Sequence, residues 1–269
     1  MITDTHEQVI GTFRKPSALR KSELFRVAVQ SLNDVLLSRF GLRLTRAGRP
    51  TRNFVEFFRH LKKLGFSPET VIDVGVAYGT PDLYEAFPRA HFYLIEPVAE
   101  FEPFIREYAS RYDMKYVIAA AGSEAGEIMI NIHSDPRRTS LLSRPSVIRR
   151  TVPVVTLDGQ CGGQQNGPCL LKVDTEGHEL SVLAGAGATL RRSDVVILET
   201  RLVAYVDGLP EFSAIVSYMQ ERGFRLYDIV DGGYRPLDGA LEVLDLAFIP
   251  EGSALHRDRR YSADGNGDW

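Results

Sequence analysis

Two glycines that follow an acid mark the first stretch of the chain that could hold a ligand. In the segment VIDVGVAYGT, Asp73 stands near the end of an apolar run, and Gly75 and Gly79 come after it. Glycine lets a backbone bend sharply and approach a ligand closely. Thr80 and Pro81 are typical of a helix start. The segment therefore predicts a strand, a glycine turn and a helix N-terminus, which together form a corner that holds nucleotides.

The spacing of the glycines bears on which nucleotide would bind. The dinucleotide pattern has a further glycine inside the turn, whereas Val76, Ala77 and Tyr78 fill the turn here. S-adenosyl-L-methionine (SAM) carries a cationic sulfonium and no phosphate. A carboxylate such as Asp73 attracts a cationic ligand, whereas it would repel the phosphates of a dinucleotide. We therefore expect SAM as the cofactor, although an ordinary glycine turn in an α/β sheet is the simpler interpretation. The expected contacts here come from Asp73, Gly75, Ala77, Tyr78, Gly79 and Thr80.

A second acid follows the next apolar run at the distance expected of a ribose-binding carboxylate. The run HFYLIEP ends in Glu96 and Pro97, and Glu96 comes 21 residues after Gly75. About 20 residues separate the glycine turn from the acid that holds the ribose hydroxyls in nucleotide-binding folds. The same spacing would suit NAD, so an NAD-linked oxidoreductase is an alternative. The missing glycine and the acid at Asp73 argue against it.

The stretch KVDTEGHE at 172–179 contains the candidate catalytic groups. Asp174 ends a predicted strand, and Glu176 and His178 stand where a helix would begin. General-base catalysis requires a group that takes up a proton, and histidine has the most suitable ordinary pKa near neutrality. His178, Asp174 and Glu176 are therefore the candidates, and Asp174 could instead bind the amino group of SAM. Lys172 lies in an otherwise apolar strand, where an unpaired charge would be costly.

Two acids are the candidates for a metal site. Asp174 and Glu199 could together hold Mg²⁺, which prefers oxygen ligands. Neither acid has a further ligand at a telling spacing, so we expect no metal ion. The two cysteines, Cys161 and Cys169, are too few for a disulfide framework or a tetrahedral metal site.

Predicted strands and helices alternate along the chain, which favours an α/β protein with a doubly wound, mostly parallel sheet. Ligands bind such sheets at the carboxyl ends of the strands, where the four acids at 73, 96, 174 and 199 are expected. The predicted domain extends over 67–250. A basic helical extension over 1–66 precedes it, with helices at 22–40 and 53–64, and a charged flexible tail over 251–269 follows it.

Charge is unevenly distributed. The 269 residues are 44% hydrophobic and 25% charged with a net charge of −3, yet residues 1–65 hold 13 Lys/Arg against 5 Asp/Glu. The excess of positive charge in this N-terminal arm, residues 1–65, predicts peripheral contact with an anionic membrane or glycolipid. A solvated helical extension is the plainer interpretation. The remaining chain is acidic, which argues against a nucleic-acid partner. No signal-peptide layout or apolar run of membrane-spanning length occurs, so we expect a cytoplasmic protein. The sequence is compatible with an oligomer.

An arginine-rich segment lies at 135–150 and could receive a phosphate or carboxylate of a substrate. A solvated loop is an equally good interpretation. Its five arginines are Arg137, Arg138, Arg144, Arg149 and Arg150.

Together these motifs resemble the FkbM-type SAM-dependent methyltransferases. The matching pieces occur in the family's order and are DVGVAYG at 73–79, IEP at 95–97, AAGSEAGE at 120–127, SLL at 140–142, VVTLD at 154–158, LKVDTEGHELSVLAGA at 171–186 and LE at 198–199. The long block around DTEGHE is the most specific. One departure is Ala77, because the family often has asparagine two residues after the first glycine.

The resemblance implies a class I methyltransferase fold of Rossmann-like type, with seven strands in the order 3-2-1-4-5-7-6 and the last one antiparallel. It also implies O-methylation of a hydroxyl on a small molecule, such as a saccharide, glycolipid or natural-product scaffold. By position it adds Pro97, Ala120, Ala121 and Ser140 to the cofactor site. A non-catalytic scaffold with this fold is a further alternative, against which the intact glycine corner argues.

Overall fold

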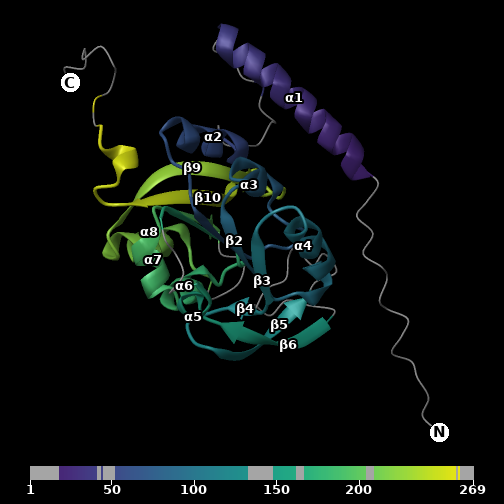
Figure 1. Ribbon diagram of the computed structural model, residues 1–269, viewed down its shortest axis with the longest axis vertical. Helices are drawn as coiled ribbons and strands as arrows, with labels where there is room; N and C mark the ends of the chain where they lie inside the picture. Colours follow the sequence, from purple (N-terminus) through teal and green to yellow (C-terminus); the bar gives the residue numbers. More distant parts are fainter. Residues whose placement is uncertain are drawn as a thin grey trace. The chain divides into compact units, whose positions relative to one another are not determined.

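The computed structural model describes residues 18–40, 44, 52–132, 148–161, 167–203, 209–258 and 260 (Figure 1). The chain divides into two compact units, Met1–Ala47 and Gly48–Trp269. The first contains the helix α1 (Ala18–Phe40). Among the described residues, none of the helices has both the length and the apolarity that crossing a bilayer requires.

The second unit is built on a seven-stranded sheet with the order β3-β2-β1-β7-β8-β10-β9. Its strands are β1 (Thr70–Val74), β2 (His91–Glu96), β3 (Met114–Ile118), β7 (Cys169–Val173), β8 (Val195–Arg201), β9 (Phe224–Tyr234) and β10 (Leu241–Pro250). β10 pairs antiparallel with both β8 and β9, and the other pairs are parallel. Numbered within this sheet alone, the order is 3-2-1-4-5-7-6, which confirms the predicted fold.

Helices cover both faces of the sheet because side chains alternate along each buried strand. On one face, Val71 and Phe92 pack with α2 (Phe54–Lys63), α3 (Pro81–Ala86) and α4 (Glu102–Ala109). On the other face, Ile72 and Tyr93 pack with α5 (Leu157–Cys161), α6 (Glu179–Ala184), α7 (Gly187–Arg192) and α8 (Phe212–Glu221). Short 3-10 helices follow β2 (Ala99–Phe101) and β10 (Ala254–His256).

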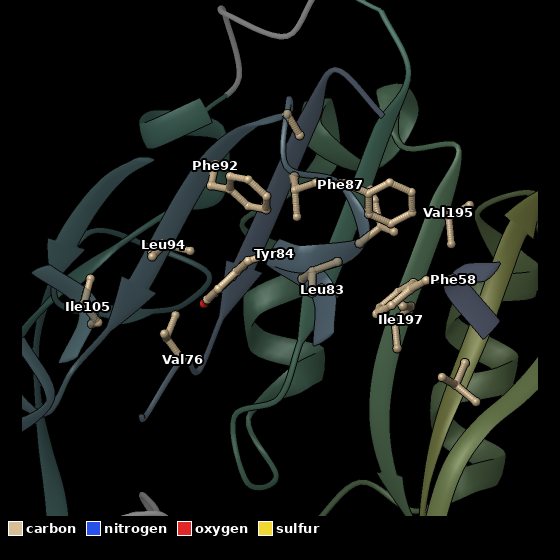
Figure 2. Packing of buried hydrophobic residues seen from close by; sticks show 14 of the residues in the cluster. Phe58, Val76, Leu83, Tyr84, Phe87, Phe92, Leu94, Ile105, Val195 and Ile197 are labelled. Carbon is tan, nitrogen blue, oxygen red and sulfur yellow. The ribbon is translucent and has the colours of Figure 1, made fainter. Parts of the chain in front are cut away.

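The helix α2 belongs to the second unit, although the sequence placed it in the N-terminal extension. Asn53 caps it by accepting a hydrogen bond from the Glu56 amide at 3.0 Å. Phe57, Phe58 and Leu61 are almost fully buried. In Figure 2, Phe58 lies in one hydrophobic cluster with Leu83 and Tyr84 of α3. This burial ties α2 to the same core as the glycine corner.

A second, three-stranded sheet branches off after β3. It consists of β4 (Ala120–Ala121), β5 (Gly126–Ile132) and β6 (Ile148–Val155) in the order β4-β6-β5. β5 pairs antiparallel with β6. The chain leaves the large sheet after Ile118, and Ala120 and Ala121 pair with β6.

Candidate functional site

Four acids gather at one edge of the large sheet. The strands β2, β1, β7 and β8 are parallel neighbours, and their last residues are in register. Glu96 ends β2, Asp73 is next to last in β1, Asp174 follows β7, and Glu199 lies near the end of β8. The expected convergence of these acids at the carboxyl edge is therefore what the fold produces.

The glycine at 75 is required by the protein's own backbone. Its φ is +80°, and a Cβ built there would lie 1.7 Å from the carbonyl oxygen of Asp174. The Asp174 amide also donates to the Val74 carbonyl at 2.9 Å. The sequence suggested that a ligand's close approach explains this glycine. The structure adds a second reason within the protein itself, because the turn after β1 and the end of β7 touch each other directly.

Glu96 holds the glycine turn together. Its side chain is 4% exposed, and its two oxygens accept hydrogen bonds from the amides of Ala77 and Val98, each at 2.8 Å. Ala77 has φ +47°, a left-handed conformation that costs a non-glycine residue about 1 kcal/mol. Burial raises the pKa of Glu96 to about 7. The Val76 amide is a third backbone donor to this carboxylate, which leaves one of its four lone-pair sites to accept from a ribose hydroxyl.

Asp73 lies beneath the turn. Its side chain is fully buried, and it accepts a hydrogen bond from the Tyr84 hydroxyl at 2.9 Å. Burial raises the pKa of Asp73. In Figure 2, Tyr84 lies between Leu83 and Leu94, and its hydroxyl is at the end of the side chain nearer Val76. Asp73 therefore supports the glycine turn from within the protein core.

Lys172 connects Asp73 to Asp174. Its ammonium lies 3.1 Å from Asp174 Oδ2 and 3.9 Å from Asp73 Oδ1. Burial acts to lower the pKa of Lys172, but the nearby carboxylates of Asp174 and Asp73 outweigh it and raise the pKa. This pairing explains how a charge is tolerated in a buried strand. Asp174 is 34% exposed, so its carboxylate can reach a ligand.

The loop between β7 and α6 adopts an unusual backbone. Glu176 has φ +55° and Gly177 has φ +104°. Glu179, only 2% exposed, stabilises this loop: its Oε1 accepts from the Thr175 amide at 3.0 Å, the Thr175 hydroxyl at 3.1 Å and the Gly177 amide at 3.0 Å. An acid in the first turn of a helix is ordinarily explained by the helix dipole. Its role as the acceptor that closes the loop appears only in three dimensions.

Arg201 was not singled out in the sequence. Its Nη2 lies 2.5 Å from Glu176 Oε2 and 3.4 Å from Glu199 Oε2, and its Nη1 lies 2.9 Å from Glu242 Oε1. Glu176 is thus ion-paired. Burial, followed by the charges of Asp174 and Glu176, raises the pKa of Glu199 well above its ordinary range. The sequence did offer one signal for Arg201: it is a cation two residues after Glu199, the acid near the end of a predicted strand.

His178 stands just before α6 and is half-buried. Its Nε2 faces Gly122, where a Cβ would lie 3.9 Å away. Among the described residues, no side chain or backbone group forms a hydrogen bond with the imidazole. Burial lowers its pKa, so the ring is neutral at neutral pH. A neutral imidazole has one nitrogen that can accept a proton.

The other predicted contacts lie around this edge, with one exception. Tyr78 packs edge-on against Phe101 and Phe104, with ring centroids 4.8 and 4.9 Å apart. Thr80 precedes α3, and Pro97 follows β2. Ala120 and Ala121 are buried in β4. The predicted contact Ser140 lies outside the described residues.

The arginine-rich segment is described only at its end. Arg137, Arg138 and Arg144 lie outside the described residues. Arg149 is exposed, and Arg150 binds both carboxylate oxygens of Glu100, at 2.6 and 2.7 Å. The guanidinium of Arg150 is therefore engaged within the protein, where it ties β6 to the short helix after β2.

Within the described ranges, no three His, Cys, Asp or Glu side chains are grouped as metal ligands would be. Cys161 and Cys169 are free and buried. Burial raises the pKa of each thiol to about 12, so both remain protonated at neutral pH.

A family model described as the methyltransferase FkbM domain matches residues 73–226. Among solved structures, the chain is similar to magnesium protoporphyrin IX methyltransferase from Synechocystis PCC 6803, with 12% identity, coverage of 84% of this chain and 81% of that one, and a TM-score of 0.42. It is also similar to 1,6-didemethyltoxoflavin-N1-methyltransferase from Burkholderia thailandensis, with 12% identity, coverage of 87% and 88%, and a TM-score of 0.40. A comparison with curated proteins found no match.

Proposed function

The chain belongs to the FkbM family of methyltransferases, and we propose that it methylates a hydroxyl oxygen of a saccharide, glycolipid or natural-product scaffold. SAM would supply an activated methyl group. The protein's task is then to align the acceptor oxygen with that methyl group, which in favourable cases lowers a barrier by about 7–11 kcal/mol.

One observation carries the cofactor part of this proposal: Glu96 and Asp174 flank the glycine turn at the same edge of the sheet. Glu96 is buried and accepts from backbone amides of the turn, and its carboxylate can accept one more hydrogen bond, from a ribose hydroxyl. Asp174 is partly exposed and lies 3.1 Å from the Lys172 ammonium. A carboxylate there attracts a cation such as a sulfonium or an ammonium group. The donor set thus fits SAM, with Asp73 and the residues around Gly75 as its support.

We assign proton removal to His178. Asp174 is paired with Lys172, and Glu176 is paired with Arg201, so each carboxylate already has a cationic partner within the protein. His178 is neutral, half-buried and free of a hydrogen-bond partner among the described residues. A neutral imidazole near pH 7 is well suited to accept a hydroxyl proton.

The test of the cofactor is calorimetry of the purified full chain with SAM, S-adenosylhomocysteine and NAD. We expect the first two to bind and to raise the melting temperature, and NAD to do neither. Preferential NAD binding would overturn the methyltransferase assignment. The acceptor is tested by incubating the chain with SAM and saccharide or glycolipid candidates and detecting a methoxy group by mass spectrometry and NMR. Methylation at nitrogen or carbon would overturn the oxygen assignment.

We further propose that the basic N-terminal arm contacts an anionic membrane or glycolipid surface. The support is its charge: 13 Lys/Arg against 5 Asp/Glu over residues 1–65. Each cation near such a surface is worth about 1 kcal/mol. The full chain should sediment with phosphatidylglycerol vesicles, less so as salt is raised, and not with phosphatidylcholine vesicles. Equal recovery with both lipids would exclude an electrostatic contact.

A further inference from the structure

The loop between β7 and α6 is held in a conformation that its own sequence disfavours. Glu176 has φ +55°, in the left-handed region where a side chain crowds the backbone. Such a residue persists when the surrounding structure holds it in place. The neighbouring residues of the loop, Asp174 and His178, are the ones to which we assign cofactor binding and proton removal. What holds Glu176 therefore matters for the site.

Glu179 fixes one part of this loop. It accepts hydrogen bonds from the amides of Thr175 and Gly177 and from the Thr175 hydroxyl. These contacts shape the backbone on both sides of Glu176. They do not involve the Glu176 side chain, which extends in another direction toward Arg201.

Arg201 binds that side chain from the neighbouring strand. Its Nη2 lies 2.5 Å from Glu176 Oε2, and the same guanidinium contacts Glu199 at 3.4 Å and Glu242 at 2.9 Å. These carboxylates come from the loop, from β8 and from β10. The Arg201 side chain is only 12% exposed and that of Glu176 27%, so water screens the pair less than it would at the surface. The carboxylates of Glu199 and Glu242, on two strands, hold the planar guanidinium in place. The guanidinium is therefore a rigid anchor for the third carboxylate, that of Glu176.

We propose that Arg201 is a positioning residue of the cofactor site: by binding Glu176 it holds the 174–178 loop in the left-handed conformation that presents Asp174 to the cofactor. This inference rests on the proposed SAM site. Without the anchor, Glu176 relaxes toward an ordinary backbone conformation. The competent loop is then only partly populated, and the apparent affinity for cofactor falls by that fraction.

The experiment is a double-mutant cycle on cofactor binding, read by calorimetry with SAM and with S-adenosylhomocysteine. Arg201→Gln should raise both dissociation constants about tenfold, the order expected from the strain of one left-handed residue. S-adenosylhomocysteine lacks the sulfonium charge, so a parallel loss identifies a loop effect, whereas a loss for SAM alone identifies a charge effect and would overturn the proposal. Glu176→Gly should bind both ligands within about threefold of wild type, since glycine adopts positive φ without strain.

The combined variant decides the mechanism. In the Glu176→Gly background, Arg201→Gln should have little further effect, because the residue that needs the anchor is gone. If Arg201→Gln costs the same tenfold in both backgrounds, Arg201 acts through Glu199, Glu242 or the fold as a whole, and the proposal is wrong. A tenfold loss in Glu176→Gly alone would show that the Glu176 carboxylate meets the cofactor directly, which also overturns it.

Two further variants keep the test decisive. Arg222→Gln is the matched control, since Arg222 lies at the end of α8 and is 40% exposed. Its guanidinium contacts residues of α8, namely the Tyr218 carbonyl and ring and, at 3.9 Å, Glu221, so the substitution should leave cofactor binding unchanged. If Arg201→Gln does not fold, Glu176→Gln removes the pair from the other side and should show the same parallel loss. Failure of the wild-type chain to bind SAM would reject the proposed function, whereas wild-type binding with an unaffected Arg201→Gln would reject only this inference.

Discussion

Replacing Glu96 with glutamine should change how the stability of the protein depends on pH. Burial raises the pKa of Glu96 from 4.5 to about 7, and in the unfolded chain the pKa returns to its ordinary value. Between these two pH values the folded state binds more protons than the unfolded state. Its contribution to stability is therefore complete below about pH 4.5 and falls as the pH rises to about 7.

The size of this effect follows from the difference between the two pKa values. At about 1.4 kcal/mol per pKa unit, wild type should lose about 3 kcal/mol between pH 4.5 and pH 7 through Glu96 alone. Burial also raises the pKa of Asp73, Glu179 and Glu199, which adds loss of the same sign. The comparison with Glu96→Gln removes these shared contributions, because glutamine does not titrate.

The assay is urea unfolding of the cofactor-free chain at several pH values from 5 to 8. Glu96→Gln should be less stable than wild type at pH 5, because its amide group cannot accept from both Ala77 and Val98. The deficit should shrink or reverse by pH 8. The exposed Glu85 on α3 offers a matched control, and Glu85→Gln should follow the wild-type curve. Parallel pH curves for wild type and Glu96→Gln would refute the reasoning.

Three more substitutions test the site. Ala77→Gly should stabilise the cofactor-free chain by about 1 kcal/mol in urea unfolding, because Ala77 has φ +47°; a loss of stability would contradict the strain. Asp174→Asn should raise the SAM dissociation constant more than that of S-adenosylhomocysteine, since it removes a charge beside a sulfonium; equal effects in calorimetry would remove Asp174 from the sulfonium. His178→Ala should keep SAM affinity and slow methyl transfer by about 10²–10⁴-fold; unchanged single-turnover rates would exclude His178 as the base.

Local sequence patterns were sufficient for the fold and for the edge at which the acids meet. Apolar runs ending in Asp73, Glu96, Asp174 and Glu199 each report a buried strand and its end. Parallel strands then bring their ends together. The antiparallel last strand came from the family resemblance, and the register in β8–β10 agrees with it. These features are readable because each depends on residues close together in the chain.

Pairing between distant segments decided the rest. Gly75 is explained by the Asp174 carbonyl 99 positions later, and Lys172 is tolerated because Asp73 lies opposite it on the neighbouring strand. Arg201 meets Glu176 and Glu242 only once β8 lies between the loop after β7 and the start of β10. Glu176 and Glu179 have the same residue type and nearly the same position, yet one is ion-paired and the other closes a loop. Such differences depend on side-chain directions and on which strands become neighbours, and the order of residues along the chain specifies these only through the complete fold.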